Sequence, residues 1–536
     1  MAGNVHGNPL LKGERPLRHD TKIMRTDWVV RLAAVAAFSL LGSSALAQEA
    51  PPPSARASAQ PGVPVRPDRS VPTKHTVTVD GEVIAYTATA GTLLIRDDND
   101  APIGSFFYVA YTKDDANKNT RPITFAYNGG PGSSSVWLHM GSIGPKRVLT
   151  PDAQTAMPGA YQLADNPSTL LDKTDIVFVD AMATGFSRIV GRGRGNQFFG
   201  IDEDAQAFSK FIRRYITVED RWTSPKFLFG ESYGTTRSAA LADVLQDQGV
   251  YLNGVTLLST VLDFNSLSPS PGGEDLSYIG FLPTEAATAW YHNRVPNKPA
   301  NLAAFVQSAR DFAAGPYASA LMRDGSLSDA ERMSIANRMH GFIGLDARYI
   351  LQSNLRVTPG RFEKELLRSQ ARTVGRLDSR YLGIDADAAG ERTEYDPTDT
   401  ATTGPFTAAF NHYIRDDLKW TGDGDYLVTN YGVVNRTWSF QRAGRGRTQA
   451  NVAGDLREAM TKNPHLRVFS ANGYYDLATP FFATQYTLSH LGLDPSLRSH
   501  IKYGFYESGH MVYLNNAALV AFKADLSSFY NDATPH

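Results

Sequence analysis

A serine between two glycines is the first candidate for chemistry in this chain. Residues 230–234 read Gly-Glu-Ser-Tyr-Gly and match the pattern G-x-S-x-G. A short apolar run, 227–229, precedes them, and a helical pattern over 235–245 follows. This strand–turn–helix context is what a nucleophile elbow requires, because glycines permit the sharp turn that projects the serine above a sheet. Ser232 is therefore predicted to be a nucleophile, and the alternative is a Gly- and Ser-rich surface turn.

Two later segments could supply an acid and a base. Asp476 closes the string N-G-Y-Y-D after the apolar run 466–470, and His510 follows the run 501–506 in the string E-S-G-H-M. A carboxylate can orient an imidazole and stabilise its cation, while the imidazole takes the proton of the serine. Taken alone, Asp476 also fits a turn and His510 also fits an ordinary core or surface histidine. The chain order Ser232, Asp476, His510 is the order of nucleophile, acid and base in α/β hydrolases, and it favours a triad.

A glycine-rich segment follows another strand-like run, 123–127. Residues 128–135 read N-G-G-P-G-S-S-S. Glycines there let backbone N–H groups approach an oxyanion without a Cβ clash. The predicted donors are the N–H of Gly130 and the N–H of Tyr233, the residue after the nucleophile. A phosphate-binding loop is disfavoured because no lysine follows at P-loop spacing.

The elements around these segments indicate an α/β fold with a mostly parallel sheet. Apolar β-like runs alternate with helical patterns over 203–216 and 235–245, which is typical of parallel strands joined by crossover helices. The predicted strands are 75–80, 83–89, 92–96, 106–111, 123–127, 176–179, 227–229, 255–259, 466–470 and 501–506. Between them the pattern is mostly helical. We therefore expect a sheet domain over 74–267 and 464–536, split by a helical cap insertion over 268–463.

Composition restricts the function classes further. The chain has 536 residues, with 53 Lys and Arg against 54 Asp and Glu, so no basic excess favours nucleic acid as a partner. It has no cysteine, which excludes disulfides, thiolate metal sites and a cysteine nucleophile. Residues 385–396 are only faintly like a calcium loop, because Ala389 and Asp396 stand where oxygen and Glu ligands are expected. No metal and no cofactor are expected.

The N-terminal residues resemble an export signal. Arg25 and Arg31 precede the apolar run 32–41, and Ala45-Leu46-Ala47 is a cleavage pattern. We expect a signal peptide over 1–47, with Met24 as the true start, and no membrane span once it is removed, because the apolar run is too short. Seven prolines in 48–73 predict an extended linker. The protein is therefore expected in the periplasm or outside the cell.

Together, the strings resemble the serine carboxypeptidases, the group that includes carboxypeptidase Y and cathepsin A. The resemblance rests on residues 128–135, 230–234, 472–476 and 509–511, with Gly144-Pro145 at the family's spacing and a degraded D-x-x-G-x-G-x-S stretch at 180–187. It covers about 74–265 and 465–536. It implies an α/β-hydrolase fold, a Ser232–Asp476–His510 triad and an oxyanion hole at Gly130 and Tyr233. It also implies that Asn128 and Glu231 bind the C-terminal carboxylate of a peptide.

Three residues depart from the family pattern. Ser133 replaces a cysteine, Ala183 replaces a glycine, and Ser142 stands where the family has a Glu that supports the carboxylate-binding pair. The substitution at 142 keeps an esterase or acyltransferase open beside the peptidase.

The resemblance implies a bacterial exported carboxypeptidase that takes peptides with a free C-terminus and works best at acidic pH. The same triad could instead serve an esterase or acyltransferase, and a catalytically inactive binding protein is the third alternative. The sequence leaves the preferred residue, the physiological substrate and the oligomeric state open.

Overall fold

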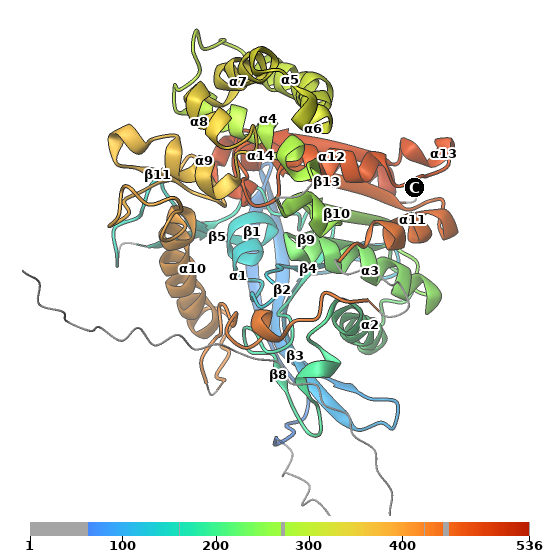
Figure 1. Cartoon of the computed structure of the whole chain (residues 1–536). Coiled ribbons are helices and arrows are strands. Elements are labelled where there is room, and N and C mark those ends of the chain that lie inside the picture. The colour runs from blue at the N-terminus through green and yellow to red at the C-terminus, as the bar shows by residue number, and fades with distance from the viewer. Residues whose placement is uncertain (1–62, 160, 270–273, 423, 443–449, 535–536) are drawn as a thin grey trace, which may run out of the picture. The chain divides into compact units, whose positions relative to one another are not determined.

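A ten-stranded sheet forms the centre of this computed structural model, which describes residues 63–534 except 160, 270–273, 423 and 443–449. The strand order is β1-β2-β3-β7-β4-β9-β10-β13-β14, and β8 pairs with β3 (Figure 1). From β7 to β14 every pairing is parallel, while β1, β2 and β3 pair antiparallel at one side. The strands are β1 (Arg69–Val79), β2 (Glu82–Arg96), β3 (Pro102–Lys113), β4 (Ile123–Tyr127), β7 (Asp175–Val179), β8 (Arg188–Ile189), β9 (Lys226–Glu231), β10 (Gly254–Leu258), β13 (Arg467–Gly473) and β14 (Ile501–Tyr506).

The first hairpin turns at Asp80-Gly81, where both residues have positive φ, 50° and 84°. The expected strands at 83–89 and 92–96 are one strand, β2. Gly91 does not interrupt this strand. A Cβ at this position would lie 2.7 Å from the ring of Tyr108, so the glycine makes room for the ring and does not mark a turn. Strand β1 begins at Arg69, so the last part of the expected linker is a strand instead. The signal peptide, the Met24 start and residues 48–62 of the linker lie outside the described residues.

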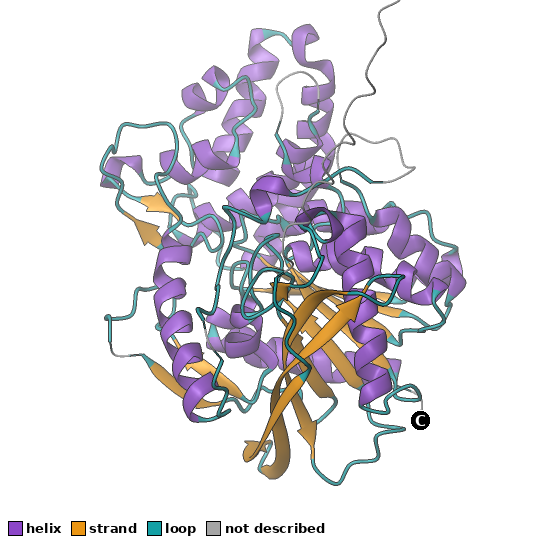
Figure 2. Cartoon of the chain, turned by 90° about the horizontal axis from the view of Figure 1, so that it is seen from below, coloured by secondary structure: helices purple, strands orange, loops and turns teal. Residues whose placement is uncertain are grey.

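Helices cover both faces of the sheet (Figure 2). Successive side chains of β9 point to opposite faces of the sheet, and both faces are apolar. Phe227 and Phe229 pack in the cluster that contains α14, while Leu228 packs with α2 and α3 on the other face. The helices are α1 (Val136–Leu138), α2 (Ile201–Val218), α3 (Tyr233–Asp247), α4 (Leu276–Tyr291), α5 (Leu302–Phe312), α6 (Ala318–Arg323), α7 (Asp329–Ile343), α8 (Ala347–Gln352), α9 (Pro359–Glu365), α10 (Pro397–Asp416), α11 (Ala453–Lys462), α12 (Phe481–Ser489), α13 (Pro495–Arg498) and α14 (Asn516–Ala533).

The expected helical insertion contains parts that pack differently. Helices α4 to α9 supply most of a hydrophobic cluster of their own, and they lie together at the top of Figure 1. Helix α10 instead contributes Phe406 and Phe410 to a core of the sheet domain, and α11 contributes Leu456 and Met460 to the other. The sheet domain therefore resumes before 464, because α11 already packs against α3. Two small hairpins complete the fold, β5 (Lys146–Leu149) with β6 (Gln162–Asp165) and β11 (Thr373–Val374) with β12 (Leu382–Gly383).

All four motif segments follow the carboxyl ends of parallel strands. Asn128 follows β4, Ser232 follows β9, Asp476 comes shortly after β13, and His510 follows β14. Parallel strands bring their carboxyl ends to one edge of a sheet, which is where open α/β sheets place their sites. The arrangement confirms the expected α/β-hydrolase fold. None of the helices in the described residues has the length and apolarity of a membrane span.

Candidate active site

The turn at Ser232 has the geometry of a nucleophile elbow. Ser232 has φ 60° and ψ −129°, a backbone conformation that residues other than glycine rarely adopt. A Cβ on Gly230 would lie 2.1 Å from the carbonyl oxygen of Gly234, and one on Gly234 would lie 2.8 Å from that of Tyr127. Both glycines of the motif are therefore required by close backbone packing. The elbow is fixed from below by the Ser232 N–H, which donates to the carbonyl of Leu258 at 2.9 Å.

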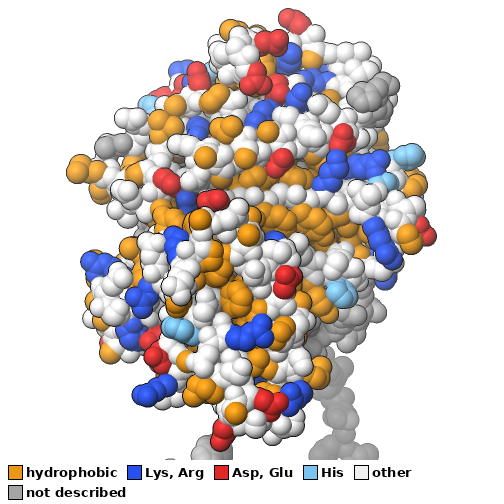
Figure 3. All heavy atoms as spheres, turned by 90° about the horizontal axis from the view of Figure 1, so that it is seen from above, with side chains coloured by type: hydrophobic (Ala, Val, Ile, Leu, Met, Phe, Trp, Pro, Cys, Tyr) orange, Lys and Arg blue, Asp and Glu red, His pale blue; other side chains and the backbone are white. Residues whose placement is uncertain are grey.

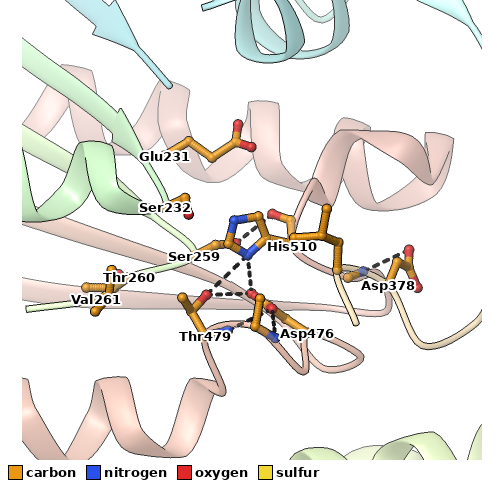
Figure 4. A network of polar contacts seen from close by, with 12 residues as sticks. Glu231, Ser232, Ser259, Thr260, Val261, Asp378, Asp476, Thr479 and His510 are labelled. Carbon is orange, nitrogen blue, oxygen red and sulfur yellow. Dashed lines mark hydrogen bonds and ion pairs between the residues drawn. The ribbon is translucent and has the colours of Figure 1, made fainter. Parts of the chain in front are cut away.

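Asp476 and His510 are brought together by their loops. Nδ1 of His510 lies 2.8 Å from Oδ2 of Asp476, and both side chains are buried (Figure 4). Asp476 also accepts hydrogen bonds from the N–H groups of Ala478 and Thr479 and from the Thr479 hydroxyl, at 2.8, 2.9 and 2.6 Å. Asp476 has no freedom to rotate away, so the imidazole is held through Nδ1 and its Nε2 is left for Ser232.

The electrostatics of His510 favour its cation. Burial alone lowers the pKa of His510, but the charge of Asp476, its hydrogen bond and the charge of Glu231 outweigh burial and raise the pKa above the usual value. Figure 4 shows Ser232 beside the imidazole ring. No hydrogen bond joins the two within the described residues, and such bonds commonly tighten only when substrate is bound.

The glycine-rich loop lies directly against the elbow. A Cβ on Gly129 would lie 2.4 Å from the backbone nitrogen of Tyr233, so only glycine permits this approach. Gly130 has φ 106°. The structure thus places the predicted oxyanion donors, the N–H groups of Gly130 and Tyr233, on adjoining backbone segments that line the same cleft as Ser232.

Glu231, the residue before the nucleophile, is a buried carboxyl group with two polar neighbours. Burial raises its pKa to about 7, although His510, Tyr513 and Asn128 each favour the charged form. The phenol of Tyr513 donates to the carboxylate at 2.9 and 3.2 Å from its two oxygens. Asn128 is oriented by the N–H of Leu138, which donates to its Oδ1 at 2.9 Å. The predicted carboxylate-binding pair therefore lies together, next to Ser232.

Ser142 takes no part in this cluster through its side chain. It is fully buried, and its Oγ has no hydrogen-bond partner in the described part of the chain. The neighbouring Gly141 packs against the ring of Tyr513, where a Cβ would lie 2.4 Å from the ring. Ala183, the other departure near the site, keeps a φ of 64°, the conformation for which a glycine is suited.

Two segments of the insertion hold the loops of the sheet domain. The first segment is 376–380. The N–H of His510 donates to the carbonyl of Leu377 at 2.6 Å, and the N–H of Gly509 donates to the carboxylate of Asp378 at 3.2 Å.

The second segment, 427–430, contacts the glycine-rich loop. The N–H of Ser134 donates to the carbonyl of Val428 at 2.9 Å, and the N–H of Asn430 donates to the carbonyl of Gly132 at 2.7 Å. The insertion therefore contributes directly to the positions of His510 and the glycine-rich loop.

These groups line a cleft of about 520 Å³. Its lining is partly apolar, and the insertion contributes charged residues to it. The apolar lining includes Trp137, Val261, Phe264, Leu267 and Met511, and the charged lining from the insertion is Arg376, Asp396 and Asp399. Figure 3 shows a band of hydrophobic side chains on one face of the molecule, with acidic and basic side chains interspersed around it.

Sequence reasoning missed Thr479, Tyr513 and the 376–380 segment. Thr479 and Tyr513 lie three residues after Asp476 and His510, so proximity along the chain was the available signal. Nothing in the local pattern of 376–380 indicates its contacts, because they join residues more than 90 positions apart.

Comparisons with known proteins agree with this arrangement. Residues 85–266 match the model of the family described as serine carboxypeptidase. Pheromone-processing carboxypeptidase KEX1 of Saccharomyces cerevisiae is 28% identical over 198 residues, which are 34% of this chain and 26% of that protein. The chain thus spans about a quarter of the length of the curated relatives it matches.

Solved structures of α/β hydrolases align with the chain at low similarity. Proline iminopeptidase of Mycobacterium smegmatis aligns with a TM-score of 0.36 and 11% identity over 83% of this chain and 98% of its own. The peroxisomal α/β-hydrolase Lpx1 of Saccharomyces cerevisiae aligns with a TM-score of 0.32 and 10% identity over 88% and 92%. Residues 85–266, which hold the glycine-rich loop and the turn at Ser232, are therefore similar to the serine carboxypeptidase family.

Proposed function

We propose that the protein is a serine carboxypeptidase that releases single C-terminal residues from peptides. Oγ of Ser232 attacks the last peptide carbonyl while Nε2 of His510 takes the serine proton. The C–N bond breaks, the leaving amine receives that proton, and an acyl-enzyme remains on Ser232. Water then attacks the ester with His510 again as base, which releases the shortened peptide and restores the serine. The N–H groups of Gly130 and Tyr233 stabilise the oxyanion in both steps.

The observation that carries this proposal is the cluster of Asn128, Glu231 and Tyr513 beside Ser232. A peptide placed with its last carbonyl at Ser232 presents its terminal carboxylate only a few ångströms away. A protonated Glu231 and the amide of Asn128 would both donate to that carboxylate. Because the pKa of Glu231 lies at about 7, the protonated form is available under mildly acidic conditions.

The positions of Glu231 and His510 also support an acidic pH preference. One proton can reside on Glu231, with His510 neutral, or on His510, with Glu231 ionised. A substrate carboxylate repels an ionised Glu231 and favours the first arrangement, in which His510 can accept the serine proton. A peptide with a free C-terminus would therefore promote the active state of the base. Above about pH 7 this proton is lost and binding weakens.

Mass spectrometry of a peptide pool after incubation tests the proposal. We expect stepwise loss of single C-terminal residues from free peptides and none from their C-terminal amides. Ser232→Ala serves as the control, with a loss of roughly 10³-fold or more that is typical when a triad member is removed. Internal cleavage, equal cleavage of acids and amides, or full activity of folded Ser232→Ala would contradict the proposal.

An esterase or acyltransferase remains the second candidate, because Ser142 brings no second carboxyl group to the site. It predicts hydrolysis or transfer of neutral acyl esters with no advantage for a free carboxylate. A third alternative, an inactive binding protein, predicts that an organophosphonate fails to label Ser232. The same peptide and ester assays separate all three.

Two further features of the protein belong to this proposal. The insertion would act as a cap that shapes side-chain preference, since its residues line the cleft beside Ser232. The protein would work outside the cytoplasm, in the periplasm or beyond, on peptide substrates and without a metal or cofactor.

A further inference from the structure

The side chain of Tyr513 donates a hydrogen bond to the Glu231 carboxylate from the turn that follows His510. Its Oη lies 2.9 Å from one carboxylate oxygen and 3.2 Å from the other. Both side chains are buried, so water does not compete for this contact. A hydrogen bond to a buried ionisable group fixes its orientation and its proton affinity at once.

The ring of Tyr513 is also confined along one edge, which holds Cδ2 and Cε2. Gly141 lies against it so closely that a Cβ there would be 2.4 Å from the ring. Tyr513 also lies three residues after His510, in the short turn that follows the base. The phenol therefore connects Glu231 to the same segment that holds the imidazole.

Tyr513 is suited to be a constant donor. Burial, followed by the charge of Glu231, raises the pKa of the phenol well above its usual value, so it stays neutral wherever the protein is folded. Among the described residues the hydroxyl of Ser142 has no hydrogen-bond partner, so it offers Glu231 no comparable contact. The phenol thus restrains a carboxyl group that lines the cleft beside Ser232.

We propose that Tyr513 is a positioning residue for recognition of the substrate carboxylate, which it achieves by orienting Glu231 and tying it to the His510 segment. This inference rests on the proposed function and names the residue that makes Glu231 selective for a free C-terminus. Substrates without that carboxylate do not use Glu231 and are therefore insensitive to the phenol.

The test compares the full-length protein with Tyr513→Phe, which keeps the ring and removes only the hydroxyl. KM and kcat are measured against pH for a blocked dipeptide and for a neutral blocked ester. We expect the peptide KM to rise about 10-fold or more, as for loss of a hydrogen bond to an ionisable group, with ester constants changed less than about 3-fold. The alkaline limb of the peptide profile should move to higher pH, because the phenol lowers the pKa of Glu231.

Tyr530→Phe is the matched control. Tyr530 is a second buried tyrosine, whose hydroxyl bonds to Thr124 near the start of β4, at the other end of the strand from Asn128. Its removal should leave the ratio of peptide to ester constants unchanged. An equal fall of peptide and ester activity in Tyr513→Phe, or an unmoved pH profile, would overturn the proposed role of Tyr513.

A second measurement separates this inference from the proposed function. Blocked amino acids and their amides are tested as inhibitors of ester hydrolysis. If the wild type binds acids and amides equally, the proposed function fails and this inference fails with it. If the wild type prefers acids and Tyr513→Phe keeps the same preference, only the role of Tyr513 is wrong.

Discussion

Glu231 and His510 are two titratable groups whose charges depend on each other across the nucleophile. Burial raises the pKa of Glu231 to about 7, and the charge of an ionised Glu231 contributes to raising the pKa of His510. The ionisation state of Glu231 thus affects the proton affinity of the imidazole. In the proposed function this dependence would connect recognition of a substrate carboxylate with the protonation state of His510.

Peptide hydrolysis should fall as pH rises through about 7, while hydrolysis of a neutral ester should be retained. The pKa of Glu231 is raised by burial, so its proton is held through the acidic range and lost near neutrality. The measurement is kcat/KM against pH for the two substrates. Superimposable profiles would show that Glu231 does not contact the substrate carboxylate.

Gly129→Ala should abolish activity while the protein still folds. A Cβ would lie 2.4 Å from the nitrogen of Tyr233, one of the expected oxyanion donors, so the loop must move away. Loss of one such donor reduces kcat by about 10²–10³-fold. Gly360→Ala, in helix α9 with open space around it, is the control and should retain normal kinetics. Near-normal turnover of Gly129→Ala would exclude this loop from the oxyanion hole.

At the scale of elements, the 376–380 segment fixes the acid and base loops. It accepts the N–H groups of His510 and Leu477, and Ser379 donates its N–H to Tyr475. The segment is itself held by a buried ion pair, in which Arg380 contacts Asp378 at 2.6 Å and also reaches Asp152. The loop positions therefore depend on a charge pair from a different part of the chain.

Arg380→Met should both destabilise the protein and lower kcat. It leaves the buried Asp378 carboxylate without its cation, which costs about 3–5 kcal/mol in comparable cases. Asp378 also accepts the N–H of Gly509, so the base should shift. Chemical unfolding and kinetics check this, with Arg323→Met as control, because its ion pair with Glu331 is exposed to solvent and contributes little to stability.

A double variant sharpens the interpretation. Adding Asp378→Asn to Arg380→Met removes the unpaired charge and should restore part of the lost stability. If Arg380→Met is no less stable than Arg323→Met, the ion pair does not support the segment.

Local patterns predicted the elbow, the acid, the base and the glycine-rich loop, because each requires particular residues at short spacing. They did not predict Tyr513 as a partner of Glu231, since any tyrosine near a turn has the same local appearance. The predicted strand boundaries were wrong where a tertiary contact determines the residue type. Gly91 lies inside a continuous strand, and it is a glycine because the ring of Tyr108 packs against it. The limits of the insertion stay a prediction, and local patterns also gave no sign that α11 packs against α3.

At the scale of the whole molecule, buried carboxyl groups connect stability to pH. Glu285 on α4 and Glu363 on α9 are almost fully buried. Burial raises the pKa of each to about 8, and for Glu285 the neighbouring Glu363 adds to the effect. Both are therefore neutral in the folded protein under acidic conditions.

The free energy of unfolding should therefore be highest at acidic pH and decline as pH rises from about 4.5 to about 8. In that range the folded protein holds protons that the unfolded chain has released, so each group removes up to about 1.4 kcal/mol per pH unit. Denaturation of the wild type and of Glu285→Gln at pH 5, 7 and 8.5 tests this. The variant should lose less stability between pH 5 and 8.5, and an identical decline would show that Glu285 is not responsible.

The two holding segments of the insertion also limit how genes of this kind can recombine. Residues 376–380 and 427–430 must match the loops that they hold, so a foreign insertion exchanged at its outer ends would arrive with the wrong partners for His510 and the glycine-rich loop. Helices α7 and α8, which pack mainly on each other and on α4, hold neither of these loops. Substitutions, insertions and exchanged segments should therefore be most frequent in those outer helices. Changes in the residues between α9 and α11 should instead accompany changes in the loops that carry His510 and the glycine-rich segment.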